Sequence, residues 1–174
     1  MKKNFFLNAV IIFTIAALFS INSLFAEDAK KQLPAVKVKD LTGKTLNTKD
    51  FDNDGKPIVI AFWATWCKPC LEELSAMSEL YDEWQKETGV KIIAISIDDS
   101  RTSKKVAPLL KSRQWTFEVY LDENSDLKRA MGVSNPPHSF LLDGNKNIVF
   151  EHNGFAQGDE ENLIDEIKKL TSAK

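Results

Sequence analysis

Two long apolar runs, Ile58 to Trp63 and Ile92 to Ile97, lie in the middle of the sequence. Each is rich in β-branched residues and has almost no polar positions, which is typical of central strands buried on both faces of a sheet. The apolar residues between the runs recur at helical spacing: Leu74, Met77, Leu80 or Tyr81, and Trp84. This pattern stops at Gly89, a residue type favoured just after a helix end. The succession predicts a βαβ unit with two parallel strands.

Shorter patterns on both sides of this unit complete the predicted domain. Val36 and Val38 alternate with lysines, which predicts an edge strand followed by a turn. The later segments are an interrupted helix over 101–113, a strand over 117–121, a short helix over 125–131, an antiparallel hairpin of strands 139–142 and 148–150, and a helix over 159–170. The sequence therefore predicts an α/β domain, in which a mixed sheet carries helices on both faces.

The first residues have the pattern of an export signal. Two lysines precede a predominantly apolar stretch, residues 5–25, and charged residues follow it. Cleavage after Ala26 would leave Leu24 at a position that prefers a small residue, so an uncleaved membrane anchor formed by residues 5–25 is the alternative. The expected organisation is a signal peptide or anchor at 1–26, a linker at 27–33 and one domain at 34–174.

Size and charge narrow the classes of function. Without residues 1–26, the 174-residue chain would keep 148 residues, which fits one domain with a single core. The chain has 23 basic and 25 acidic side chains, and loss of the two lysines in the signal would leave 21 basic groups and a net charge of −4. Because no basic run is long enough to bind phosphates, nucleic acid is not expected as a partner.

The two cysteines, Cys67 and Cys70, follow a predicted buried strand and begin the predicted helix. The free N–H groups and the positive dipole end of a helix stabilise a thiolate, which lowers a cysteine pKa from about 8.5 to roughly 3.5–7.5. We therefore expect Cys67 to attack a substrate disulfide and Cys70, one helical turn later, to resolve the mixed disulfide. Pro69 fits this place because the first turn of a helix does not use its N–H.

Two other roles for the cysteine pair agree less well with the sequence. A purely structural disulfide that closes so short a loop removes little entropy from the unfolded chain. A zinc site would need two further thiolate or imidazole ligands, and the two histidines, His138 and His152, are not at ligand spacing. The strand-then-helix context and the export pattern favour redox chemistry.

Two segments of the chain together resemble one protein family. Phe62 to Cys70 reads FWATWCKPC, and Gly132 to Asp143 reads GVSNPPHSFLLD. They are similar to the TlpA/ResA branch of the thioredoxin superfamily, and the similarity covers most of residues 34–172. The resemblance implies a thioredoxin-like fold and a protein-disulfide oxidoreductase that is periplasmic, or anchored in the inner membrane with its domain facing the periplasm. Many members of this branch reduce disulfides in partner proteins, including apocytochromes c before haem attachment.

The same resemblance implies roles for two adjacent prolines. It places Pro137 at the cis-proline that packs against the active-site disulfide and offers backbone atoms to the substrate. Pro136 occupies the preceding position, whose backbone N–H in the family bonds the substrate strand. Proline has no N–H to donate, so substrate docking must lose or replace that bond.

Aromatic side chains and histidines near the motif have simpler interpretations. Trp66, beside Cys67, is expected to be exposed as an apolar landing surface for a substrate polypeptide. The other tryptophans, Trp63, Trp84 and Trp115, are expected in the core. His138 either lines the site or is an exposed polar residue at the start of a strand.

A thioredoxin-like enzyme also needs a proton acceptor, because Cys70 must lose its proton before it can attack. Many thioredoxins use a buried aspartate in the strand before the motif, but the matching residue here is Ala61. The branch that the chain resembles uses a glutamate three residues after the second cysteine, and Glu73 matches it. The alternative is that Glu72 and Glu73 are both ordinary acids of the first helical turn. Burial and a raised pKa would distinguish Glu73 from Glu72.

These features favour a reductase of protein disulfides that receives electrons from a membrane protein and needs no organic cofactor or metal. The residues between the cysteines, Lys68 and Pro69, favour the reducing direction. The alternatives are an oxidase that donates disulfides and a module whose thiols hold a soft metal or an apocytochrome. A peroxidase of related fold is disfavoured, because two residues would separate its threonine from the reactive cysteine, whereas Trp66 alone separates Thr65 from Cys67.

Overall fold

The computed structural model describes residues 31–172. The expected signal or anchor at 1–26, and most of the expected linker at 27–33, lie outside these residues, so the predicted boundaries stay predictions. The described residues belong to one compact unit. Within this part of the chain, no helix has the length and hydropathy needed to cross a bilayer.

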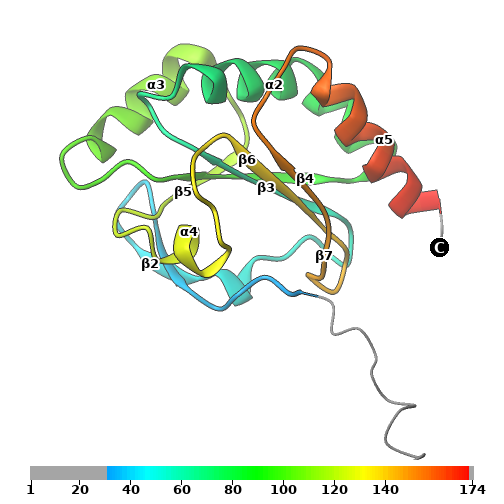
Figure 1. Ribbon diagram of the computed structural model, residues 1–174, viewed down its shortest axis with the longest axis horizontal. Coiled ribbons are helices and arrows are strands. Elements are labelled where there is room, and N and C mark those ends of the chain that lie inside the picture. Colours follow the sequence, from blue (N-terminus) through cyan, green and yellow to red (C-terminus); the bar gives the residue numbers. More distant parts are fainter. Residues whose placement is uncertain (1–30, 173–174) are drawn as a thin grey trace, which may run out of the picture. The chain divides into compact units, whose positions relative to one another are not determined.

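A seven-stranded mixed sheet forms the centre of the described unit (Figure 1). Its strands are β1 (Lys37–Asp40), β2 (Thr45–Asn47), β3 (Ile58–Trp63), β4 (Lys91–Ser96), β5 (Glu118–Leu121), β6 (His138–Leu142) and β7 (Ile148–Asn153). They follow the order β2-β1-β5-β4-β3-β6-β7. The pairs β3–β4 and β4–β5 are parallel, and the other neighbours are antiparallel. This arrangement confirms the predicted α/β class with a mixed sheet.

The described α-helices cover both faces of the sheet. They are α2 (Lys68–Thr88), α3 (Val106–Arg113), α4 (Asp126–Ala130) and α5 (Asp159–Ser172). Figure 1 shows α2, α3 and α5 on one face and α4 on the other. The residues of β3 alternate between two cores: Val59, Ala61 and Trp63 belong to one cluster, and Ile58, Ile60 and Phe62 to the other. Burial on both faces explains why this strand is a continuous apolar run.

The first two strands differ from the prediction. A strand near Val38 was expected at the edge of the sheet, but β1 lies between β2 and β5, and β2 forms the edge. β2 has three residues, of which Leu46 alone is apolar. So short a strand carries no periodic signal, and the polar residues around it read as a turn.

Helix α2 begins and ends close to the predicted positions, and this places the cysteines. The chain leaves the central strand β3 at Trp63 and enters α2 at Lys68. At the other end, Gly89 adopts a left-handed conformation with φ of 69°, and its N–H donates to the carbonyl of Gln85 at 2.8 Å. The cysteine motif therefore lies between the middle of the sheet and the N-terminus of the longest described helix.

Candidate active site around the Cys67–Cys70 disulfide

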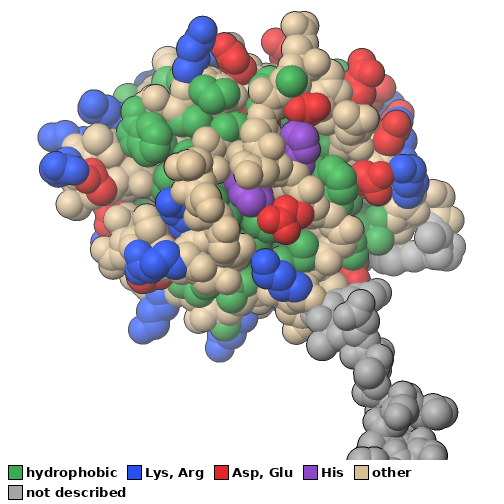
Figure 2. Space-filling model, in the orientation of Figure 1, with side chains coloured by type: hydrophobic (Ala, Val, Ile, Leu, Met, Phe, Trp, Pro, Cys, Tyr) green, Lys and Arg blue, Asp and Glu red, His purple; other side chains and the backbone are tan. Residues whose placement is uncertain are grey.

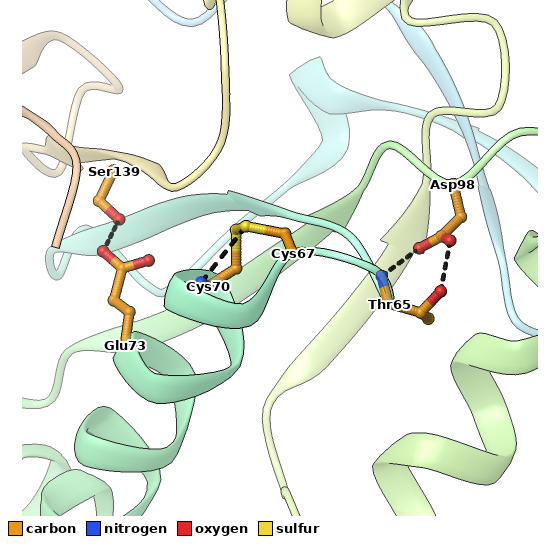
Figure 3. The surroundings of a disulfide bond; sticks show 6 residues. All are labelled: Thr65, Cys67, Cys70, Glu73, Asp98 and Ser139. Atoms are coloured by element: carbon orange, nitrogen blue, oxygen red, sulfur yellow. Dashed lines mark hydrogen bonds between the residues drawn. A yellow bond between two sulfur atoms is a disulfide. The ribbon is translucent and has the colours of Figure 1, made fainter.

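Cys67 and Cys70 form a disulfide at the start of α2 (Figure 3). Cys67 is the N-cap residue of the helix, and its Sγ accepts the backbone N–H of Cys70 at 3.3 Å. Pro69 lies in the first helical turn, as expected from its missing N–H. Cys67 keeps 6% of its surface exposed, whereas Cys70 is completely buried. A substrate can therefore reach the sulfur of Cys67 before that of Cys70.

Glu73 is the buried carboxyl group on the same helix, one turn after Cys70. It is 2% exposed, and its Oε1 accepts the hydroxyl of Ser139 at 2.8 Å. Its other oxygen, Oε2, has no hydrogen-bond partner. Burial, which disfavours the charged form, raises the pKa of Glu73 from 4.5 to about 7. The Ser139 hydrogen bond opposes this rise, and the nearby charge of Asp159 adds to it.

Glu72 differs from Glu73 in each of these respects. Its side chain is 57% exposed and forms a surface ion pair with Lys68 at 3.6 Å. Such an exposed pair contributes little to stability. The structure thus gives Glu73 the burial and raised pKa that were expected of a functional acid, while its catalytic role stays a prediction.

Ser139, the partner of Glu73, was missed by the sequence analysis. It lies in β6 directly opposite Ala61 of β3 in the antiparallel register. Ala61 lies in the same core cluster as the two cysteines, and the buried carboxyl group near them belongs to Glu73 of α2. The signal in the sequence is a single polar residue inside the apolar run 139–142.

The segment between β3 and Cys67 is bound by a second carboxylate that the sequence analysis also missed. Asp98, just after β4, accepts both the backbone N–H and the hydroxyl of Thr65, at 2.8 and 2.6 Å. Asp98 belongs to a polar run, 98–101, that reads as an ordinary turn. The signal that could have found it is the period of two in a strand, which places Ser96 and Asp98 on the same side.

The two prolines lie in the loop before β6. The peptide bond between Pro136 and Pro137 is cis, as the family resemblance implied for Pro137. Pro137 is buried, and its carbonyl already accepts the N–H of Gly154 at 2.9 Å. A carbonyl oxygen has two acceptor lone pairs, so the Gly154 bond occupies one of the two at Pro137.

The tryptophans are placed as expected. Trp66 is 62% exposed beside the disulfide, whereas Trp63 has no exposed surface. Trp84 and Trp115 are buried in the same core as Trp63. The structure therefore offers Trp66 as the one indole next to Cys67 that a substrate can contact.

Both histidines pair with acidic side chains. His138 is 5% exposed and stacks on Phe140 with ring centroids 4.6 Å apart. Its Nε2 lies 2.8 Å from Oε1 of Glu151. The alternative prediction, an exposed polar residue at the strand start, is therefore wrong. His152 lies 3.0 Å from Asp159. Figure 2 shows the two histidines (purple) on one face of the molecule, each beside an acidic side chain (red).

A small cavity of about 20 Å³ lies beside Glu73, enough for roughly one water molecule. Its polar lining includes Ser139, His152 and Asp159, and the apolar lining comes from Met77, Phe150, Phe155 and Leu163. The cavity connects the buried carboxyl group with the partly exposed His152–Asp159 pair. In residues 31–172, no group of three or more histidine, cysteine or acidic side chains is arranged to hold a metal ion.

The fold and the site together define a class, the thiol-disulfide oxidoreductases of thioredoxin-like fold. The chain belongs to the AhpC/TSA family, whose model matches residues 29–151, and it is similar to the ResA proteins. Thiol-disulfide oxidoreductase ResA of Bacillus cereus is 37% identical over 179 residues, which cover 98% of this chain and 99% of that protein. This likeness over nearly the whole chain confirms the family resemblance of the two motifs.

Solved structures agree with this placement. A thioredoxin-like protein from Porphyromonas gingivalis is 49% identical and superposes with a TM-score of 0.74 over 82% of this chain and 94% of that one. StoA from Bacillus subtilis, at 22% identity, has a TM-score of 0.60 over 76% of this chain and 97% of that one. The first shows close similarity in sequence and fold, and the second shows the fold alone.

Proposed function

We propose that the chain reduces disulfides in partner proteins on the oxidising side of a bacterial inner membrane. Cys67 is the attacking thiol, Cys70 the resolving thiol and Glu73 the acceptor of the Cys70 proton. The observation that carries this proposal is the arrangement on α2, where a reachable Cys67 caps the helix and a buried Glu73 follows Cys70 by one turn. The export pattern of residues 1–26 supports the location.

In the first step, the thiolate of Cys67 attacks one sulfur of the substrate disulfide. A bond forms between Cys67 Sγ and that sulfur, the substrate S–S bond breaks, and the second substrate sulfur leaves as a thiolate. The helix N-terminus favours the attacking form, because its backbone N–H groups and dipole stabilise negative charge on Cys67. Trp66, exposed next to Cys67, offers apolar surface to the substrate chain.

In the second step, Cys70 attacks Cys67 Sγ and closes the internal disulfide. The substrate's first sulfur leaves as a thiolate, so two electrons have passed from the dithiol to the substrate. Cys70 must first lose its proton in a buried place, and Glu73 has an unbonded oxygen and a pKa of about 7 with which to take it. Figure 3 shows the Glu73 carboxyl group beside the disulfide, with one oxygen bound to Ser139 and the other free.

The proton on Glu73 then has to reach solvent before the next turnover. The cavity beside Glu73 leads to His152 and Asp159, whose side chains are 37% and 24% exposed. A water in this cavity would connect the carboxyl group with a titratable pair near the surface.

The oxidised chain needs two electrons to regain its thiols, and a membrane dithiol protein is the proposed donor. The name of the relatives, thiol-disulfide oxidoreductase, leaves the substrate open. Apocytochromes c before haem attachment are the proposed substrate class, on the basis of the family resemblance. Their paired cysteines form the kind of disulfide that the mechanism consumes.

The reduction potential of the Cys67–Cys70 pair tests this direction. Equilibration with glutathione or dithiothreitol buffers, followed by alkylation of free thiols, gives the potential directly. We expect a value near that of thioredoxin, about −270 mV. A value near −120 mV would make the pair a strong oxidant and would favour the alternative, a disulfide donor.

A further inference from the structure

Asp98 is a fully buried carboxyl group near the disulfide, and two of its three side-chain hydrogen bonds go to Thr65. Its Oδ1 accepts the hydroxyl of Thr65 at 2.6 Å. Its Oδ2 accepts the backbone N–H of Thr65 at 2.8 Å and the hydroxyl of Ser96 at 2.9 Å. Three donors therefore hold one side chain in a fixed orientation, because each would be left unpaired in a buried place if Asp98 moved.

These bonds continue the sheet toward the nucleophile. The backbone of β4 holds β3 as far as the bond from the Ile97 N–H to the carbonyl of Trp63, at 2.9 Å. The pairing of β3 with β4 ends here. After this point the side chain of Asp98, rather than the backbone of β4, is hydrogen-bonded to Thr65. The next hydrogen bond along the chain joins the N–H of Cys67 to the carbonyl of Ala64 at 3.1 Å. Figure 3 shows Asp98 and Thr65 on one side of the disulfide and Glu73 and Ser139 on the other.

We propose that Asp98 is a positioning residue, which fixes Thr65 and thereby presents Trp66 and the sulfur of Cys67 to a substrate disulfide. The inference rests on the proposed role of Cys67 as the attacking thiol. Attack requires the thiolate to line up with the bond that it breaks, and a misplacement of about 1 Å can slow a reaction on the order of a hundredfold. Residues 64–67 have no regular secondary structure, so the Asp98 bonds hold Thr65 where no strand pairing does, between the end of β3 and the helix cap at Cys67.

Two substitutions of Asp98 separate its hydrogen bonds from its charge. Asp98→Asn removes the charge, but its amide oxygen can accept the Thr65 N–H while its NH₂ donates to the Thr65 hydroxyl oxygen. Asp98→Ala removes the same charge and all three bonds. A difference between these two variants therefore belongs to the hydrogen bonds. Thr65→Val removes only the hydrogen bond from the Thr65 hydroxyl, and the separate variant Thr65→Ser keeps this hydroxyl.

Asp122 provides a matched control. It is 3% exposed and accepts the backbone N–H groups of Leu127 and Lys128 at 3.2 and 2.8 Å, so it fixes the first turn of α4. Asp122→Ala removes a buried carboxylate with backbone partners, as Asp98→Ala does. It reports how far a general loss of stability, measured for each variant by urea unfolding, affects the reaction.

The experiment measures the attack of Cys67 on oxidised glutathione in the full-length chain carrying Cys70→Ser. The reaction forms one Cys67–glutathione disulfide and releases one glutathione thiolate. We expect Asp98→Ala to react about 10- to 100-fold more slowly and Thr65→Val about three- to tenfold more slowly. Asp98→Asn, Thr65→Ser and Asp122→Ala should stay within about threefold of the parent chain.

Equal rates for Asp98→Ala and Asp122→Ala would overturn the proposal, and so would an Asp98→Asn variant as slow as Asp98→Ala. If Asp98→Ala does not fold, the comparison of Thr65→Val with Thr65→Ser decides the question in the same assay. An oxidising potential of the Cys67–Cys70 pair would contradict the reductase function but leave these rate differences in place. The two proposals can therefore fail separately.

Discussion

Two buried carboxyl groups flank the disulfide, and they have opposite hydrogen-bond environments. Glu73 has one donor, the Ser139 hydroxyl, and an unbonded oxygen, and its pKa is raised to about 7. Asp98 has three donors on its two oxygens. The two side chains are almost equally buried, with Glu73 2% and Asp98 0% exposed. They therefore differ in the number of hydrogen-bond donors around them, not in burial. In the proposed mechanism the unbonded oxygen of Glu73 takes a proton, whereas the hydrogen bonds of Asp98 hold Thr65 and Ser96 in place.

The largest expected effect concerns Glu73 and the resolution of the mixed disulfide by Cys70. Glu73→Gln keeps the size of the side chain and a partner for Ser139 but cannot accept a proton. We expect resolution of the mixed disulfide by Cys70 to slow by about 10²- to 10⁴-fold, while the initial attack by Cys67 keeps its rate. Rapid acid quenching followed by mass spectrometry of the mixed disulfide distinguishes the two steps.

Glu72→Gln is the control for that substitution. Glu72 lies in the same helical turn but is exposed, and its ion pair with Lys68 is a surface contact. We expect both steps to stay within about twofold of the parent rate. An equal delay in Glu72→Gln and Glu73→Gln would mean that acidity of the helix start matters, and the special role of Glu73 would be lost.

A smaller effect concerns the free energy of unfolding. A carboxyl group whose pKa is raised on folding contributes stability that is complete below its unfolded pKa and is lost as the pH rises through its folded pKa. For Glu73, with values of 4.5 and about 7, the loss lies between these pH values. It amounts to about 3 kcal/mol at most.

Urea unfolding of the oxidised protein at a series of pH values measures this contribution. The parent chain should lose stability relative to Glu73→Gln as the pH rises from 4.5 to 8. A constant difference between the two proteins would show that Glu73 titrates in the ordinary acid range. The contrast between the two carboxyl groups would then reduce to a difference in geometry.

The smallest expected effect is a shift in a pH profile. The Ser139 hydroxyl stabilises the charged form of Glu73, so it lowers the pKa of that group. Ser139→Ala should raise this pKa further, by about one pH unit, and move the profile of the resolution step to higher pH. Thr65→Val, which alters the Asp98 side, should leave the midpoint of this profile unmoved.

Long regular patterns were sufficient to predict most of the fold. The runs of β3 and β4 and the period of α2, with its end at Gly89, determined the core unit, since each spans many residues. β2 was missed because three residues contain too little pattern. The position of β1 inside the sheet depends on pairing with β5, about 80 residues later in the chain, and periodicity carries no information about partners so far away.

The same limit applies to the site. The spacing of Cys67 and Cys70 and the family resemblance located the cysteines, Glu73 and Pro137, because these features are local motifs; their roles stay predictions. The partners of the two carboxyl groups could not be predicted. Thr65 and Asp98 are 33 positions apart, and Glu73 and Ser139 are 66 apart. A pattern shows on which side of a strand a residue lies, but not what faces it.

Cys67 Sγ is both the cap of α2 and one of the two sulfur atoms that gain or lose electrons. The folded and unfolded chain in their two redox forms make a closed thermodynamic cycle. The difference in unfolding free energy between dithiol and disulfide therefore equals the shift in potential that folding imposes, with about 1.4 kcal/mol for each 30 mV. Any change that frays the first turn of α2 would alter the electron affinity of the pair without touching either sulfur, and melting curves of the two redox forms would report it.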